Sequence, residues 1–257
     1  MTATRYESYV ICTSPRSGST LLCSLLEATG VAGVPDSYFH QPSVAEWIKD
    51  LGLSPDPAKG EVETLQEVFR KAIALGSGDT GMFGLRLQRH SFACFTEKLA
   101  LLHPDPATDV GRLEAVFGRT LFVHLTREDK LDQAVSFLKA QQSGLWHRAP
   151  DGSELERLSA PQELRYDREA IAAEMAEMVA MDAAWADWFK GEEIDPLRLT
   201  YGGLSADPIG TLKTVLTALG RDPAAADTVE IGVAKLSDAT NEDWVRRFRT
   251  EATGTQA

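Results

Sequence analysis

Two kinds of apolar pattern alternate along the chain: short runs that indicate strands, and longer stretches that indicate helices. The run at 9–13 has no polar alternation, as expected of a strand buried on both faces of a parallel sheet. Further strands are predicted at 81–88, 120–126 and 194–201. Helices are predicted at 19–29, 61–75, 91–102, 128–142, 164–190, 207–219 and 241–251. Segments at 31–43, 50–60 and 148–162 are predicted to be loops.

Strands that alternate with helices favour an α/β fold, in which helices flank a central, mostly parallel sheet and give three layers. The sequence has no internal repeat and no low-complexity segment, so we expect a single domain over residues 1–257. A chain of 257 residues, 43% of them hydrophobic, is long enough to bury a core of this kind.

The chain is strongly acidic, with 26 basic against 38 acidic residues and a net charge of −12. This charge argues against nucleic acid and anionic membranes as partners, so any anion site must be local. Three cysteines, without metal-site spacing, are expected to be free thiols in a reducing compartment. The sequence shows no signal peptide and no membrane-spanning run, which predicts a cytoplasmic protein with no integral membrane segment.

The segment TSPRSGST at 13–20 joins the first predicted strand to the first predicted helix and has the composition of an anion-binding loop. Gly18 lets the backbone approach an anion or adopt a positive φ, and Ser17, Ser19 and Thr20 supply hydroxyl groups. The N–H groups and dipole of the helix favour negative charge here, and Arg16 adds a fixed positive charge. The alternative is an ordinary helix cap beside a turn glycine.

The loop lacks the lysine of the triphosphate-binding pattern G-x-x-x-x-G-K-[ST], which argues against hydrolysis of ATP or GTP. A donor that carries one 5′-phosphate with an attached sulfate would need less cationic charge and no metal.

Several segments resemble the sulfotransferases, most closely the bacterial trehalose 2-sulfotransferase family. TSPRSGSTLLCSLLEATGVAGVP resembles that family's 5′-phosphosulfate loop, first helix and acceptor loop, and FVHLTREDKLDQAVSFLKA resembles its 3′-phosphate motif. LTYGGLSADPIGTLKTVLTALG and NEDWVRRFRTE are similar to later segments of the family. The resemblance implies a P-loop-like fold, 3′-phosphoadenylyl sulfate as co-substrate, and a hydroxyl acceptor on a carbohydrate, glycolipid or other small molecule. Relatives include dimers, so a homodimer is possible.

Carried over by position, the resemblance assigns two groups of residues to the donor. The 5′-phosphosulfate is assigned to Arg16, Ser17, Gly18, Ser19 and Thr20, and the 3′-phosphate to Arg127 and Ser136. Lys235 is expected to add positive charge nearby.

The position of Arg127 also suits a ligand site, because it follows a predicted buried strand at the edge where crevices open in such sheets. Ser136 shares a predicted helix face with Asp132, and can therefore look toward Arg127. The alternative is a surface ion pair between Arg127 and Asp129 or Asp132.

The acceptor loop departs from the family pattern at the catalytic base. Aligned on Gly33 and Pro35, the family's Glu corresponds to Ser37, whose hydroxyl has no useful basicity near neutral pH. Asp36 and His40 are the candidates to replace it, since an imidazole with an unperturbed pKa near ~6.5 suits this role. Either could instead be a structural residue of the loop, and a loose transition state would make a base matter little.

The acceptor is expected to contact residues 35–37. Arg86, which matches a family Lys, is expected to reach the sulfate or the acceptor, unless it forms a strand-end ion pair. Trp47 and Trp146 are candidates to stack on a sugar ring, with core packing as the alternative for either. Arg16 is the first candidate to stabilise the leaving phosphate.

The sequence therefore predicts a sulfotransferase that moves a sulfuryl group to a hydroxyl by metal-free in-line transfer. Two alternatives stay open: a catalytically inactive nucleotide-binding relative, and a small-molecule kinase with a degenerate P-loop.

Overall fold

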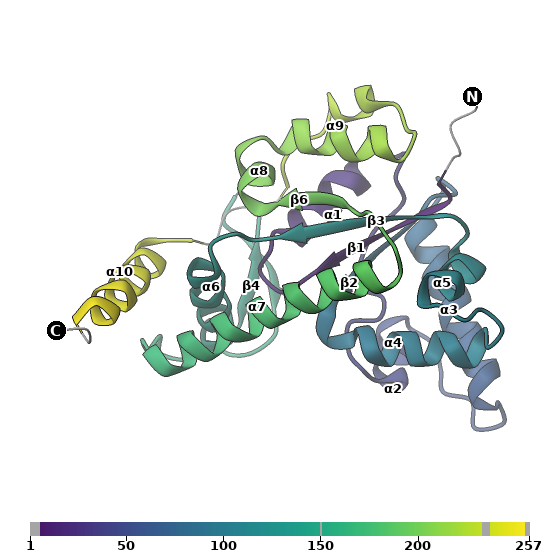
Figure 1. Ribbon diagram of the computed structural model, residues 1–257, viewed down its shortest axis with the longest axis horizontal. Coiled ribbons are helices and arrows are strands. Elements are labelled where there is room, and N and C mark those ends of the chain that lie inside the picture. Colours follow the sequence, from purple (N-terminus) through teal and green to yellow (C-terminus); the bar gives the residue numbers. More distant parts are fainter. Residues whose placement is uncertain (1–5, 150, 233–236, 255–257) are drawn as a thin grey trace.

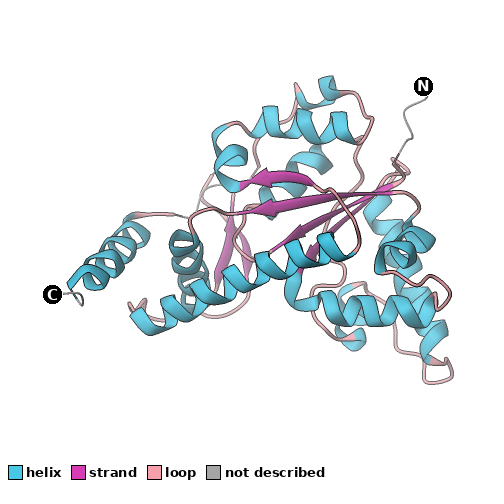
Figure 2. Cartoon of the chain, in the orientation of Figure 1, coloured by secondary structure: helices cyan, strands magenta, loops and turns pink. Residues whose placement is uncertain are grey.

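A four-stranded sheet lies at the centre of the computed structural model, which describes residues 6–149, 151–232 and 237–254 (Figures 1 and 2). The strands are β1 (Ser8–Thr13), β2 (Phe83–Gln88), β3 (Thr120–Thr126) and β6 (Leu197–Thr200). They are all parallel, in the order β2–β1–β3–β6. Their carboxyl ends therefore lie at one edge of the sheet, where Thr13 is in register with Gln88 and Leu125.

Helices connect the strands and cover both faces of the sheet. In chain order they are α1 (Ser19–Ala28), α2 (Val44–Asp50), α3 (Glu61–Ser77), α4 (Arg89–Leu102), α5 (Asp109–Phe117), α6 (Lys130–Ser143), α7 (Arg168–Gly191), α8 (Tyr201–Ala206), α9 (Pro208–Ala218), the 3₁₀ turn η1 (Pro223–Ala226) and α10 (Ala239–Gly254). Figure 1 shows α1, α8 and α9 on one side of the sheet and α4, α5 and α7 on the other.

The side chains of β1 alternate between two apolar cores, one on each face. Val10 and Cys12 pack with residues of α2, α3, α4, α5 and α7, whereas Tyr9 and Ile11 pack with residues of α1 and α9. All four are at most 1% exposed. A strand buried on both faces needs no polar alternation, so the predicted three-layer α/β fold with a parallel sheet is confirmed.

The segment at 148–162, predicted to be a loop, contains part of an antiparallel hairpin. Strands β4 (Leu145–Arg148) and β5 (Glu154–Arg157) pair with His147 opposite Glu156. Helices α2 and α5 were not predicted either. The strand predicted at 194–201 is shorter, because Thr200 accepts a hydrogen bond from the Gly203 N–H and begins α8.

The segment at 31–43 has no helix or strand, as predicted, yet it is tied to the sheet edge. Asp36 forms an isolated parallel bridge with Leu85 of β2, and the Arg86 N–H donates to the Asp36 carbonyl at 3.0 Å. Phe39, fully buried in the first core, anchors the far end of the segment. This pairing places Asp36 and Ser37 beside Arg86 of β2.

Candidate active site

The turn between β1 and α1 has a backbone conformation suited to an anion. Gly18 lies in the left-handed region at φ 89°, and the non-glycine residue Arg16 also has a positive φ of 62°. A Cβ atom on Gly18 would lie 2.7 Å from the Tyr201 ring, so glycine is required on steric grounds as well. The first N–H groups of α1, beginning at Ser19, have no earlier helical turn to bond and are directed at this turn.

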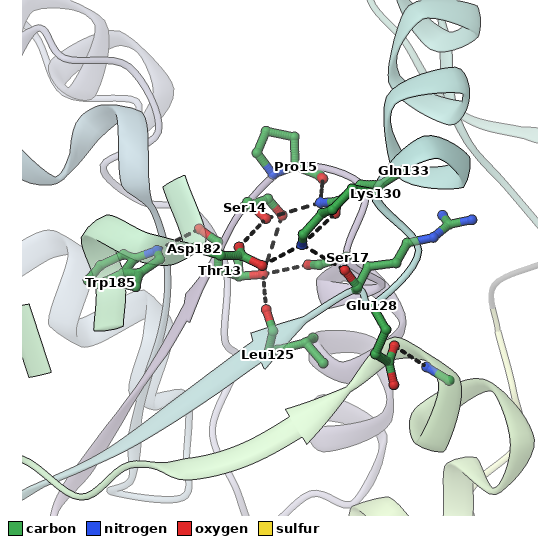
Figure 3. Close-up of polar contacts among 12 residues, drawn as sticks. Thr13, Ser14, Pro15, Ser17, Leu125, Glu128, Lys130, Gln133, Asp182 and Trp185 are labelled. Carbon is green, nitrogen blue, oxygen red and sulfur yellow. Dashed lines mark hydrogen bonds and ion pairs between the residues drawn. The ribbon is translucent and has the colours of Figure 1, made fainter. Parts of the chain in front are cut away.

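A polar network behind the turn fixes its shape (Figure 3). The Ser14 hydroxyl donates to the Asp182 carboxylate of α7 at 3.0 Å, and the Gln133 amide of α6 donates to Ser14 Oγ at 3.0 Å and to the Pro15 carbonyl at 2.6 Å. Lys130 pairs with the same Asp182 carboxylate and donates to Gln133 Oε1 at 3.0 Å. Side chains of α6 and α7 therefore fix the conformation of the turn without a ligand.

Two arginines and a serine predicted to bind the donor meet at this turn. Arg16 donates from Nε to Ser136 Oγ of α6 at 3.1 Å and from Nη1 to the Trp146 carbonyl at 2.7 Å. Arg127 donates from Nη1 to the Arg16 carbonyl at 3.4 Å, and its guanidinium carbon lies 4.5 Å from the centre of the Tyr201 ring. The two predicted phosphate subsites are thus adjacent in space, although 111 residues separate Arg16 from Arg127.

The charges of these two arginines are incompletely balanced. Within the described residues, no carboxylate lies within ion-pair distance of Arg16, and burial together with the charge of Arg127 lowers the pKa of Arg16 to about 10. Arg127 is 9% exposed and pairs at 3.7 Å with Asp132, a carboxylate open to solvent. Asp129, the other predicted partner, instead caps α6 and pairs with Arg249. Buried positive charge of this kind favours an anionic ligand.

A cavity of about 940 Å³ opens beside the turn, a size that suits a small-molecule ligand. The predicted site residues that line it are Arg16, Gly18, Ser19, Thr20, Asp36, Ser37, His40, Arg86, Arg127 and Ser136. Trp146 lines it too, as predicted for one of the two tryptophans.

Arg86 joins the anion turn to the acceptor loop. It donates from Nη1 to Thr20 Oγ1 at 2.6 Å, from Nε to Ser37 Oγ at 2.7 Å and from Nη2 to Asp36 Oδ1 at 3.2 Å. The predicted ion pair therefore exists, and it lies inside the cavity rather than at a remote strand end. The Asp36 carboxylate also accepts the Ser37 N–H at 2.7 Å, so one of its oxygens is already engaged.

Comparison with known families decides the class of protein. A family model described as Stf0 sulphotransferase matches residues 8–251. The chain belongs to the Stf0 sulphotransferase family. Its enzymatic class, a transferase of sulfuryl groups, follows from that membership.

Two curated relatives of the chain are named trehalose 2-sulfotransferase, one from Mycobacterium tuberculosis and one from Mycolicibacterium smegmatis. Each is 30% identical to the chain, over 95% of this chain and 95% of the relative. Among solved structures, the sulfotransferase domain of the Synechococcus olefin synthase aligns over 97% of both chains, with 16% identity and a TM-score of 0.45.

Several ionisable residues of the cavity were not predicted from the sequence, among them a histidine and a glutamate of the β4–β5 hairpin. His147 of β4 has Nε2 3.0 Å from Thr20 Oγ1 and 3.2 Å from Glu156 Oε2 of β5. Both residues line the cavity. No sequence signal identifies them, since each strand has four residues and the hairpin carries no periodic apolar pattern.

His40 lies in the same cavity and contacts a second histidine. The two rings are perpendicular with centres 5.0 Å apart, and His90 Nε2 lies 2.9 Å from the His40 carbonyl. Burial, with a smaller contribution from His90, lowers the pKa of His40, so this imidazole is neutral at physiological pH.

Three predicted site residues have positions outside the cavity lining. Trp47 is fully buried, donates from Nε1 to the Gln41 carbonyl and meets the Phe39 ring edge-on, so its predicted role in stacking on a sugar is wrong. The Ser17 hydroxyl is buried against Thr13 Oγ1 at 2.5 Å, and Pro35 is buried beside β2. Lys235 lies outside the described residues.

In the part of the chain that the structure describes, no group of three or more His, Cys, Asp or Glu side chains is placed to hold a metal ion. No described helix is both long enough and apolar enough to cross a bilayer.

Proposed function

We propose that this protein transfers a sulfuryl group from 3′-phosphoadenylyl sulfate to a hydroxyl of a carbohydrate, glycolipid or other small-molecule acceptor, without a metal. Family membership supports the sulfuryl transfer, and the names of the two curated relatives support a sugar acceptor. The donor, the acceptor class and the residue roles below are our proposals.

One observation carries the proposal: the convergence of Arg16, Arg127 and Ser136 on a braced turn at the start of α1. The turn suits the 5′-phosphosulfate, which needs N–H donors and a cation on a compact group. Arg127 and Ser136 suit a second phosphate on the same nucleotide. Because the chain as a whole has a net charge of −12, this local concentration of guanidinium groups indicates a site for an anion.

The roles of the arginines follow from their positions. As the sulfur–oxygen bond breaks, negative charge develops on the 5′-phosphate, and Arg16 is placed to stabilise it from a site shielded from water. Arg86, which bridges Thr20 and Ser37, is placed to orient the sulfuryl group toward the acceptor. Trp146 offers an aromatic surface for a sugar ring.

A kinase fits the site less well. Lys130, a lysine close to the turn, pairs with Asp182 and donates to the Arg127 carbonyl at 2.6 Å, so it braces the turn instead of facing the cavity.

Thermal unfolding in the presence of nucleotides tests the donor. Adenosine 3′,5′-bisphosphate at a hundred times its Kd should stabilise the protein by about 2.7 kcal/mol, which corresponds to a Tm increase of roughly 5 °C or more. ADP, which lacks the 3′-phosphate, should give a much smaller increase. An equal increase with ATP and Mg²⁺ would overturn the proposal in favour of a kinase.

A further inference from the structure

The β4–β5 hairpin brings a carboxylate to the cavity that Ser37, the position of the expected base, also lines. Glu156 of β5 lies opposite His147 of β4 in the hairpin register, and both side chains line the cavity. His147 Nε2 contacts Glu156 Oε2 at 3.2 Å and Thr20 Oγ1 at 3.0 Å. The hairpin thus touches the start of α1, where the sulfuryl group of the proposed donor would lie.

A continuous set of contacts links the Ser37 position to this carboxylate. Ser37 Oγ accepts from Arg86, Arg86 donates to Thr20 Oγ1, and Thr20 contacts His147, which contacts Glu156. Glu156 therefore approaches the reaction zone from the wall formed by the hairpin, whereas Ser37 approaches it from the acceptor loop. A carboxylate on either wall can meet a hydroxyl that lies between them.

Asp36, which neighbours Ser37, is less suited to the task. Its Oδ1 already accepts hydrogen bonds from the Ser37 N–H and from Arg86 Nη2, so this oxygen is engaged within the protein. Glu156 is different, because it contacts a neutral imidazole, that of His147. Burial, with the charges of Arg16 and Arg86, lowers the pKa of His147 to about 3, so at neutral pH this contact is a hydrogen bond and not an ion pair.

We propose that Glu156 is the general base that accepts the proton of the acceptor hydroxyl, in place of the carboxylate expected at residue 37. This inference rests on the proposed function. In the step, the hydroxyl oxygen bonds to sulfur while the bond from sulfur to the 5′-phosphate oxygen breaks, and its electron pair goes to the phosphate. The hydroxyl proton goes to the Glu156 carboxylate and then to solvent, to which 45% of this side chain is open.

The charges around Glu156 suit a base that works near neutral pH. Burial raises the pKa of Glu156, Arg86 of β2 lowers it, Asp36 of the acceptor loop raises it and Arg16 of the turn lowers it, with a net rise above the usual value. A carboxylate with a raised pKa is a stronger base. His147, the facing group on β4, is placed to orient it by donating from Nε2.

The test compares Glu156→Gln with Glu154→Gln, a matched change on the same strand at a residue that pairs with Arg157 and does not line the cavity. Turnover is measured with 3′-phosphoadenylyl sulfate and trehalose, or glucose if trehalose is not sulfated. Glu156→Gln should lower kcat by about a hundredfold or more, the typical contribution of a general base. Glu154→Gln should keep the wild-type kcat. Both variants should bind adenosine 3′,5′-bisphosphate with wild-type affinity in calorimetry, which shows that each is folded.

Two further measurements distinguish a base from a merely structural residue of the hairpin. If Glu156 is the base, the acidic limb of the kcat/KM pH profile, which lies at a pH above the ordinary carboxyl range, disappears in Glu156→Gln. In the Glu156→Gln background, Ser37→Glu then restores part of the turnover. Equal kcat for Glu156→Gln and wild type overturns the inference, as does an equal loss in Glu154→Gln. A wild-type protein that transfers no sulfate to trehalose, to glucose or to any other hydroxyl acceptor contradicts the proposed function instead.

Discussion

Replacing Gly18 by alanine tests whether the turn and the 3′-phosphate subsite are mechanically connected. The residue has φ 89°, which costs a residue with a Cβ about 1–2 kcal/mol. The new Cβ would lie 2.7 Å from Tyr201 Cδ2 and 3.2 Å from Cε2, so the ring must move, at a cost of about 1–3 kcal/mol. Together these predict a loss of about 2–5 kcal/mol, or a Tm lower by roughly 4 °C or more.

The same substitution should weaken donor binding. Arg127 stacks on the Tyr201 ring at 4.5 Å, so displacement of the ring removes the surface that positions this guanidinium. We expect the affinity for adenosine 3′,5′-bisphosphate, measured by titration calorimetry, to fall about tenfold, equivalent to about 1.4 kcal/mol.

Gly30→Ala is the matched control, because Gly30 follows the other end of α1, also has a positive φ of 65°, and a Cβ there would have no neighbour within 4 Å. Gly30→Ala should lower the free energy of unfolding by only the cost of a positive φ, about 1–2 kcal/mol, and leave donor affinity unchanged. Identical losses of stability and of affinity in the two variants would refute the reasoning, since the contact with Tyr201 would then have no effect.

Three further predictions concern separate parts of the molecule. Trp47→Ala should lower the free energy of unfolding by about 3–5 kcal/mol in urea titrations, because the indole is fully buried; a loss below 1 kcal/mol would contradict its position in the core. Arg127→Gln should weaken binding of adenosine 3′,5′-bisphosphate about tenfold or more but leave that of 5′-AMP unchanged; equal weakening of both would exclude a 3′-phosphate contact. His147 has a folded-state pKa of about 3, below its unfolded value of 6.5, so the unfolded state takes up a proton first and stability falls as pH drops from 6.5 toward 3. His147→Gln should therefore lose less stability than wild type between pH 7 and pH 5 in urea titrations, and an unchanged loss would show that His147 does not cause it.

The parts of the fold that the sequence predicts well are those with a strong local pattern. The apolar runs of β1 and β3 needed no partner to be recognised, because burial on both faces shows in each run alone. The anion turn was predictable for a similar reason, as its glycine, hydroxyl groups and following helix are contiguous in sequence. Arg16 and Arg127 were assigned to the donor by the family resemblance, and the structure shows them adjacent because β1 and β3 are neighbouring parallel strands that end at one edge.

The parts that were missed depend on long-range packing. Whether Trp47 faces a cleft or the core is decided by Phe39 and by aromatic residues of α3 and α4, none of them next to it in sequence. The hairpin that carries His147 and Glu156 has short, largely polar strands, and its cavity contacts are made to Thr20, more than 120 residues earlier. The part of the site least visible in the sequence is therefore the part that holds our proposed base.

Sulfuryl transfer is tested most directly by mass spectrometry of the products after incubation of the wild-type protein with 3′-phosphoadenylyl sulfate and a panel of hydroxyl acceptors that contains trehalose and glucose. We expect a sulfated acceptor and adenosine 3′,5′-bisphosphate in equal amounts, with no requirement for added Mg²⁺. Binding of the donor without a sulfated product from any acceptor of the panel would contradict the proposed transfer and indicate an inactive nucleotide-binding relative.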